Sequence, residues 1–159
     1  MSTLAWLEQT EFSDWVLTAF SGFPLMLTLH AVGLAVSMGL ILVMDLRLLG
    51  FFNFVSYKFL QRALLLAWAG LVINFLSGTV LFVPRGVEYA GDPAFLTKMV
   101  LIVLGLGNTG WLHGQIVSES GTWSSEVAAP VPVRYWAAAS MFLWFGVITS
   151  GRLIAYVGS

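Results

Sequence analysis

Four long apolar stretches constrain this chain more than any other feature of its sequence. They cover residues 23–44, 60–83, 95–117 and 135–157, and the short connections between them hold most of the charged residues. A helix that crosses a bilayer needs about 20 largely apolar residues, and each stretch is long enough. Within lipid the backbone has to satisfy its own hydrogen bonds, which favours helices. The sequence therefore predicts an all-α fold: a four-helix transmembrane bundle in which residues 1–159 form a single domain.

The composition agrees with a membrane protein and excludes several other classes. Charged residues make up 9% of the chain, whereas a soluble domain carries roughly 25%. The net charge of -1 and the lack of a basic patch give no reason to expect a nucleic-acid partner. The absence of cysteine excludes disulfides and Cys-ligated metal centres. The first residues lack Lys and Arg, so no cleaved signal peptide is expected.

Residues 1–22 differ from the rest of the chain. Trp6 and Trp15 are mixed with acidic residues and Ser, and Ser13-Asp14 has the chemistry of a helix N-cap. Pro24 and the residues just before it are expected to break any preceding helix. We therefore predict an N-terminal interfacial segment of one or two short helices, with its Trp side chains at headgroup level.

The basic residues predict an orientation. The connection between the first two spans carries Arg47, Lys58 and Arg62, whereas the N-terminal segment has no basic residue. Cytoplasmic loops carry an excess of Lys and Arg. The first connection is therefore expected in the cytoplasm and both termini on the periplasmic side.

Two histidines fall inside the predicted spans, where ionisable side chains are costly and usually face an interior site. They are His30 and His113. At 1.5 Å per residue, His30 is about 10 Å and His113 about 27 Å below the outer boundary. The axial nitrogens of one iron are only about 4 Å apart. If both residues are metal ligands, they therefore serve two sites, one near each face. His30 is the first candidate, because His113 lies closer to the cytoplasmic headgroups, where an uncoordinated histidine costs less.

This arrangement is similar to the stacked b-haems of membrane cytochromes, in which imidazoles from transmembrane helices hold iron. Haem also needs apolar walls, close helix contacts and cations for its propionates. The residues predicted to bind the cofactor are His30, Gly33, Lys98 and Arg152 at the outer site and His113 and Arg47 at the inner site. The leading hypothesis is a haem-bearing redox subunit that moves electrons between a membrane quinol and a periplasmic redox protein.

The number of histidines leaves the haem stoichiometry open. Two bis-histidine haems need four imidazoles, and the chain has two. A homo-oligomer would supply each histidine again, and several Gly-rich helix faces also favour symmetric association. Alternatively Met26 or Lys98 is the sixth ligand, a site stays five-coordinate, or there is a single haem at His30. One or two haems per chain, or haems shared between chains, agree with these ligands.

A non-redox function is the alternative hypothesis. In a transporter, channel or assembly subunit, His30, Lys98, Asn74 and Asn108 would line a polar path or hold helices together. Asp45 is the acidic residue closest to a predicted span, and it is placed at the edge. Small residues that share one helix face, such as Gly70 with Gly78 and Gly107 with Gly114, indicate either helix packing or a flat cofactor.

Several short motifs occur in a specific order along nearly the whole chain. They are Leu29-His30-x-x-Gly33, Asp45-Leu-Arg-Leu-Leu-Gly50, Asp92-Pro-Ala-Phe-x-x-Lys98, Asn108 followed by His113, and Gly151-Arg-Leu-Ile-Ala-Tyr156. Together they resemble a family of small bacterial four-helix integral membrane proteins of unknown function, although Asp92 stands where Asn is expected. The resemblance implies a bacterial inner membrane location and no particular activity. The haem hypothesis rests on the residues themselves.

Overall fold

The structure, a computed structural model, describes residues 3–119, 121, 123 and 129–157, and side chains up to residue 154. It confirms the all-α fold, and the described residues contain no strand. Four long helices are α3 (Phe23–Leu49), α4 (Tyr57–Phe82), α6 (Pro93–Glu119) and α7 (Val131–Val157). The short elements are α1 (Thr3–Glu8), α2 (Glu11–Thr18), the 3₁₀ turn η1 (Val83–Arg85) and α5 (Gly86–Gly91).

The four long helices make the chain an integral membrane protein. Each contains an 18-residue window with a mean hydropathy of at least 1.4, which is sufficient to cross a bilayer. Large apolar side chains cover the outside of the bundle, for example Leu65, Phe75 and Phe142 at 64%, 66% and 80% exposure. Water would disfavour such a surface, whereas hydrocarbon does not.

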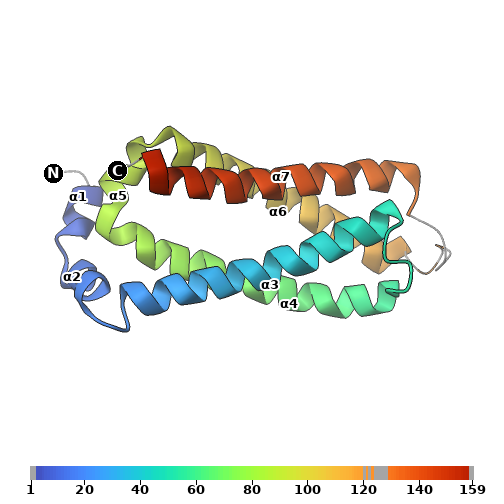
Figure 1. Cartoon of the computed structure of the whole chain (residues 1–159), viewed down its shortest axis with the longest axis horizontal. Helices are drawn as coiled ribbons and strands as arrows, with labels where there is room; N and C mark the ends of the chain where they lie inside the picture. The colour runs from blue at the N-terminus through green and yellow to red at the C-terminus, as the bar shows by residue number, and fades with distance from the viewer. Residues whose placement is uncertain (1–2, 120, 122, 124–128, 158–159) are drawn as a thin grey trace.

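The long helices pack as two antiparallel pairs. α3 packs most extensively against α4 and α6 against α7, and α3 also contacts α7. Figure 1 shows both termini at one end of the bundle, together with α1, α2 and α5. We call this the terminal end. The opposite end, which holds the connections after α3 and after α6, is the loop end.

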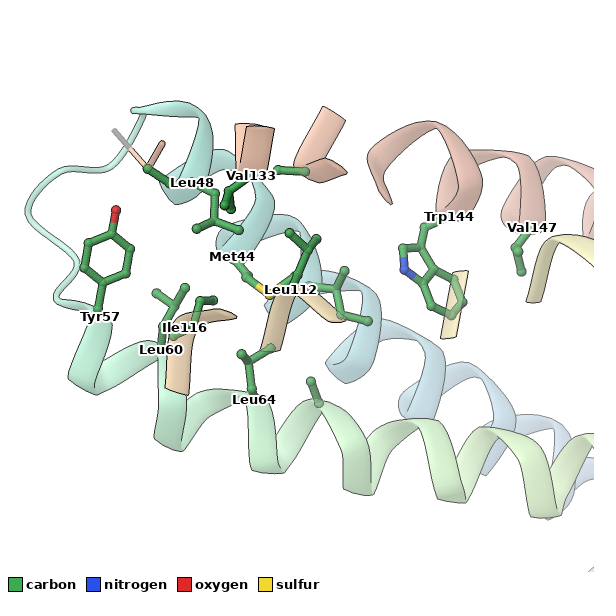
Figure 2. Packing of buried hydrophobic residues seen from close by; sticks show 14 residues of the cluster. Met44, Leu48, Tyr57, Leu60, Leu64, Leu112, Ile116, Val133, Trp144 and Val147 are labelled. Carbon is green, nitrogen blue, oxygen red and sulfur yellow. The ribbon is translucent and has the colours of Figure 1, made fainter. Parts of the chain in front are cut away.

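The hydrophobic core is concentrated toward the loop end. Figure 2 shows Met44 and Leu48 of α3 directed toward α4 and α6, where Leu60, Leu64 and Leu112 meet them. These side chains are 0–2% exposed. The other buried members of this core are Ile41, Tyr57, Ala67, Ile116, Ala129, Val133, Ala137, Trp144 and Val147. All four long helices therefore interlock in the loop half.

Toward the terminal end, small residues bring α3 and α4 together. A Cβ placed on Gly33 would lie 2.8 Å from both the Asn74 nitrogen and the Gly70 oxygen, and a Cβ on Gly70 would lie 2.9 Å from the Gly33 oxygen. Next to them, the buried Ser37 hydroxyl donates to the Gly33 carbonyl over 2.7 Å. The two backbones are thus close enough that neither glycine position accepts a larger side chain without a shift.

The N-terminal segment forms two short helices, as predicted, but its N-cap differs from the prediction. The Thr10 hydroxyl, rather than Ser13 or Asp14, caps α2 by accepting from the Ser13 N–H over 3.3 Å. Ser13 is buried within α2. The segment is tied to the bundle by the Glu8 carboxylate, which accepts from the Val87 N–H over 2.8 Å.

Candidate functional site

His30 is held by hydrogen bonds between α3 and α4. Its Nδ1 lies 2.9 Å from the Asn74 carbonyl oxygen and 3.3 Å from the Ser77 hydroxyl. A carbonyl oxygen only accepts, so Nδ1 carries the proton and a neutral ring keeps its lone pair on Nε2. Nε2 makes no hydrogen bond with the described residues. The Asn74 amide completes the contact by donating to the His30 carbonyl over 2.8 Å.

The space beside the His30 ring is provided by Gly78 on α4. A Cβ on Gly78 would lie 3.0 Å from His30 Cε1 and 3.2 Å from Nδ1. Gly33, which was predicted to clear room for a cofactor, instead allows the α3–α4 backbone contact. The sequence indicated that Gly78 lies on a packing face of its helix, but it did not predict that this face meets the His30 ring.

Lys98 and Arg152 supply positive charge at the terminal end. Lys98 on α6 is partly buried and lies near enough to His30 for their charges to interact. Its Cε and Nζ would be 3.6 Å from a Cβ on Gly151, so the absence of a side chain there leaves room for the ammonium group. Arg152, the next residue on α7, is exposed. Lys98 makes no hydrogen bond or ion pair with any residue that the structure describes.

His113 has the opposite hydrogen-bond chemistry. The Trp68 indole on α4 donates to His113 Nδ1 over 3.0 Å, and the two rings stack with centroids 6.4 Å apart. An indole N–H only donates, so Nδ1 is the acceptor and a neutral ring carries its proton on Nε2. A metal needs a ring nitrogen with a free lone pair. In this arrangement His113 offers none.

The two histidines bond to different levels of the same helix. Their partners, Trp68 and Asn74, are six residues apart on α4, which corresponds to about 9 Å of helix rise. That spacing is too large for the rings to share one metal. Among the described residues, no group of three or more His, Cys, Asp or Glu side chains could hold a metal ion either.

Arg47 is built into the loop end instead of facing a cofactor. It is 0% exposed although it carries a charge. Its Nε donates to the Val55 carbonyl over 2.8 Å and its Nη1 to Asn53 Oδ1 over 3.2 Å. The guanidinium also lies 4.3 Å from the centre of the Tyr57 ring. These contacts fix the α3–α4 loop, so the predicted role of Arg47 as a propionate partner does not fit its position.

Asn108 bonds across α6 and α7, whereas His30 bonds across α3 and α4. The Asn108 amide donates to the Trp136 carbonyl over 3.0 Å and so joins α6 to α7. It lies beside an open groove on the outer surface of these two helices, which Gly107 and Trp111 also line. A Cβ on Gly107 or Gly114 would meet no described atom within 4 Å, so these two glycines do not pack against the described part of the chain.

No family model, curated protein or solved structure matches this chain. The resemblance drawn from the short motifs therefore stays a prediction, and functional inference rests on the residues described above.

Proposed function

We propose that this protein is a membrane redox subunit in which His30 is an iron ligand of a b-type haem. The proposal rests on the hydrogen bond that His30 Nδ1 donates to the Asn74 carbonyl oxygen. Metal-binding histidines usually donate their other ring N–H to a carbonyl or carboxylate, which fixes the tautomer and orients the ring. His30 has this partner, and its Nε2 has none among the described residues.

The charges at the terminal end support the same proposal. Haem propionates need cations near the membrane boundary, and arginine binds carboxylates through charge-assisted hydrogen bonds. Lys98 lies within electrostatic reach of His30, and Arg152 is exposed at the same end of α7. A propionate would also neutralise Lys98, which has no acidic partner in the described chain. If this end faces the periplasm, electrons would pass from a membrane quinol to a periplasmic redox protein.

We favour one haem site over the two that the sequence suggested. His113 accepts a hydrogen bond at Nδ1 and Arg47 binds the α3–α4 loop, so neither residue is part of the proposed site. A second axial ligand for His30 would come from another copy of the chain, which makes a homo-oligomer part of the proposal, or from Met26, one turn away on α3. A measured ratio of half a haem per chain would indicate that two copies of the chain share one haem.

Haem measurements on matched variants test the proposal. Purified protein is expected to show a Soret band and sharpened α-bands on reduction with dithionite. His30→Ala is expected to lose at least nine-tenths of the haem per folded chain, whereas His113→Ala keeps it. Adding imidazole to His30→Gly is expected to restore part of the spectrum, because free imidazole can replace the missing ligand. Full haem content with an unchanged spectrum in His30→Ala would refute the assignment.

The competing proposal is a non-redox transporter or assembly subunit, which the polar contacts between helices favour. Asn74 bridges α4 to α3 and Asn108 bridges α6 to α7, as expected of residues that hold a bundle together. A colourless, iron-free preparation from cells supplied with haem would favour this proposal over the redox one.

A further inference from the structure

Asp45 on α3 is a buried carboxyl with no charged partner among the described residues. It is 1% exposed, and neither of its oxygens makes a hydrogen bond with the described residues. The sequence placed it at the edge of a span, but α3 continues to Leu49 and Asp45 faces the interior. The remaining four residues of α3 correspond to about 6 Å of rise, so Asp45 lies roughly one turn inside the loop end.

A small cavity adjoins this carboxyl between α3 and α7. Its volume is about 50 Å³, and apart from Asp45 its lining is apolar, including Met38, Trp144 and Phe145. A water molecule needs about 10–15 Å³ of such space and two to four polar partners. The buried Ser140 hydroxyl on α7 also faces Asp45, although Ser140 does not line the cavity. The cavity therefore has room for water against the two oxygens of the Asp45 carboxyl.

No cation in the part of the chain that the structure describes pairs with Asp45. Arg47 directs its guanidinium to Val55 and Asn53 in the loop. The other charged side chains that the structure describes at the loop end, Lys58, Arg62, Glu119 and Arg134, are exposed. A carboxylate buried without a counter-charge is costly, so the group needs either a proton or a bound cation.

The available ligands favour a proton over a metal cation. Hard cations such as Mg²⁺ and Ca²⁺ take six to eight oxygen ligands. The two carboxyl oxygens of Asp45 and the nearby Ser140 hydroxyl provide three, and the lining of the cavity apart from Asp45 is apolar. A proton needs a single oxygen and removes the negative charge directly.

We infer that Asp45 is a proton-binding site that exchanges one proton with the aqueous phase at the loop end, about one helical turn away. Uptake forms one O–H bond on a carboxyl oxygen and leaves the group neutral, and release returns the proton to water. The inference is independent of the proposed haem site, because it uses residues in the other half of the bundle.

Infrared spectroscopy of protein labelled with ¹³C at the aspartate carboxyl carbon tests this inference. The chain has three aspartates, Asp14, Asp45 and Asp92, so the double variant Asp14→Asn/Asp92→Asn retains Asp45 alone. This variant is expected to show a protonated-carboxyl band that falls as the bulk pH is raised and returns when the pH is lowered. Asp45→Asn added to the double variant removes the last aspartate carboxyl and is therefore expected to lack the band.

Two outcomes would overturn the inference. If the double variant shows no protonated-carboxyl band at any pH at which it stays folded, Asp45 remains ionised. If the band does not change over that pH range, the proton is a fixed structural feature and is not exchanged. The double variant is sufficient to decide even if Asp45→Asn does not fold, because its two substitutions lie outside the core.

Discussion

The loop half and the terminal half of this bundle are stabilised by different interactions. In the loop half, large apolar side chains from all four long helices interlock, and the buried Arg47 is bonded to the loop. In the terminal half, α3 and α4 meet through glycines and through the bonds between His30 and Asn74. Two cations of that half, Lys98 and Arg152, have no hydrogen bond or ion pair with the described residues, whereas Arg85 pairs with Glu88. The terminal half therefore retains groups that can bind a ligand.

The two histidines illustrate this difference. His113 bonds through Nδ1 to Trp68, and an indole can only donate, so the bond uses the lone pair that a metal would need. His30 bonds through Nδ1 to a carbonyl, which leaves the lone pair on Nε2 available. Depth in the membrane already favoured His30 over His113 as a ligand, and the hydrogen-bond partners add a chemical reason for that preference.

The largest loss of stability is expected from a cavity in the loop half. Leu112 is 0% exposed at the centre of the core, and Leu112→Ala should lower the free energy of unfolding by about 2–5 kcal/mol. Leu104→Ala on the same helix is the matched control, because that side chain is 53% exposed to lipid. Unfolding by SDS titration from a mild detergent measures both. Equal losses in the two variants would show that the core does not stabilise the loop half.

A smaller loss is expected where the helices meet in the terminal half. The new methyl group of Gly33→Ala would clash with the α4 backbone, and overpacking of this kind costs about 1–3 kcal/mol. Gly39→Ala on the same helix is the control, because a Cβ there meets no atom within 4 Å. The same SDS titration should show a loss for Gly33→Ala and no loss for Gly39→Ala. If Gly33→Ala also keeps the His30 tautomer and full stability, the close contact is not essential.

The fold could be predicted from the sequence because apolar length is a local property. The ends of the helices were predicted less accurately. Hydropathy indicates which residues lie in lipid, whereas capping and turn residues decide where a helix ends. The first span was predicted to end at Met44, before the charged Asp45, yet α3 continues to Leu49 and ends at Gly50, whose φ of 101° suits glycine. Asp45 and Arg47 remain in the helix because both are buried.

The candidate site was predictable only in part. Residue type and depth were enough to select His30 and Lys98. The tautomer of His30, the position of Gly78 beside its ring and the loop contacts of Arg47 all depend on which helices are neighbours. The chain order does not reveal which face of α4 meets α3 and which meets α6, so these contacts required the structure.

The smallest effect is expected from removing the hydrogen bond that distinguishes His113. Trp68→Phe keeps an aromatic ring at that position but removes the indole donor, and loss of one such bond costs about 0.5–1.5 kcal/mol. Its clearer consequence is chemical: His113 Nδ1 loses its donor, so the ring is no longer restricted to the tautomer with the proton on Nε2. Nitrogen-15 NMR of the two histidine side chains measures the tautomers directly. The spectrum of His113 is expected to change while that of His30 stays constant, and Trp111→Phe, at an outward-facing residue of α6, should alter neither. A change confined to His30, or the same tautomer for both rings in the natural protein, would contradict the proposed difference between the two halves.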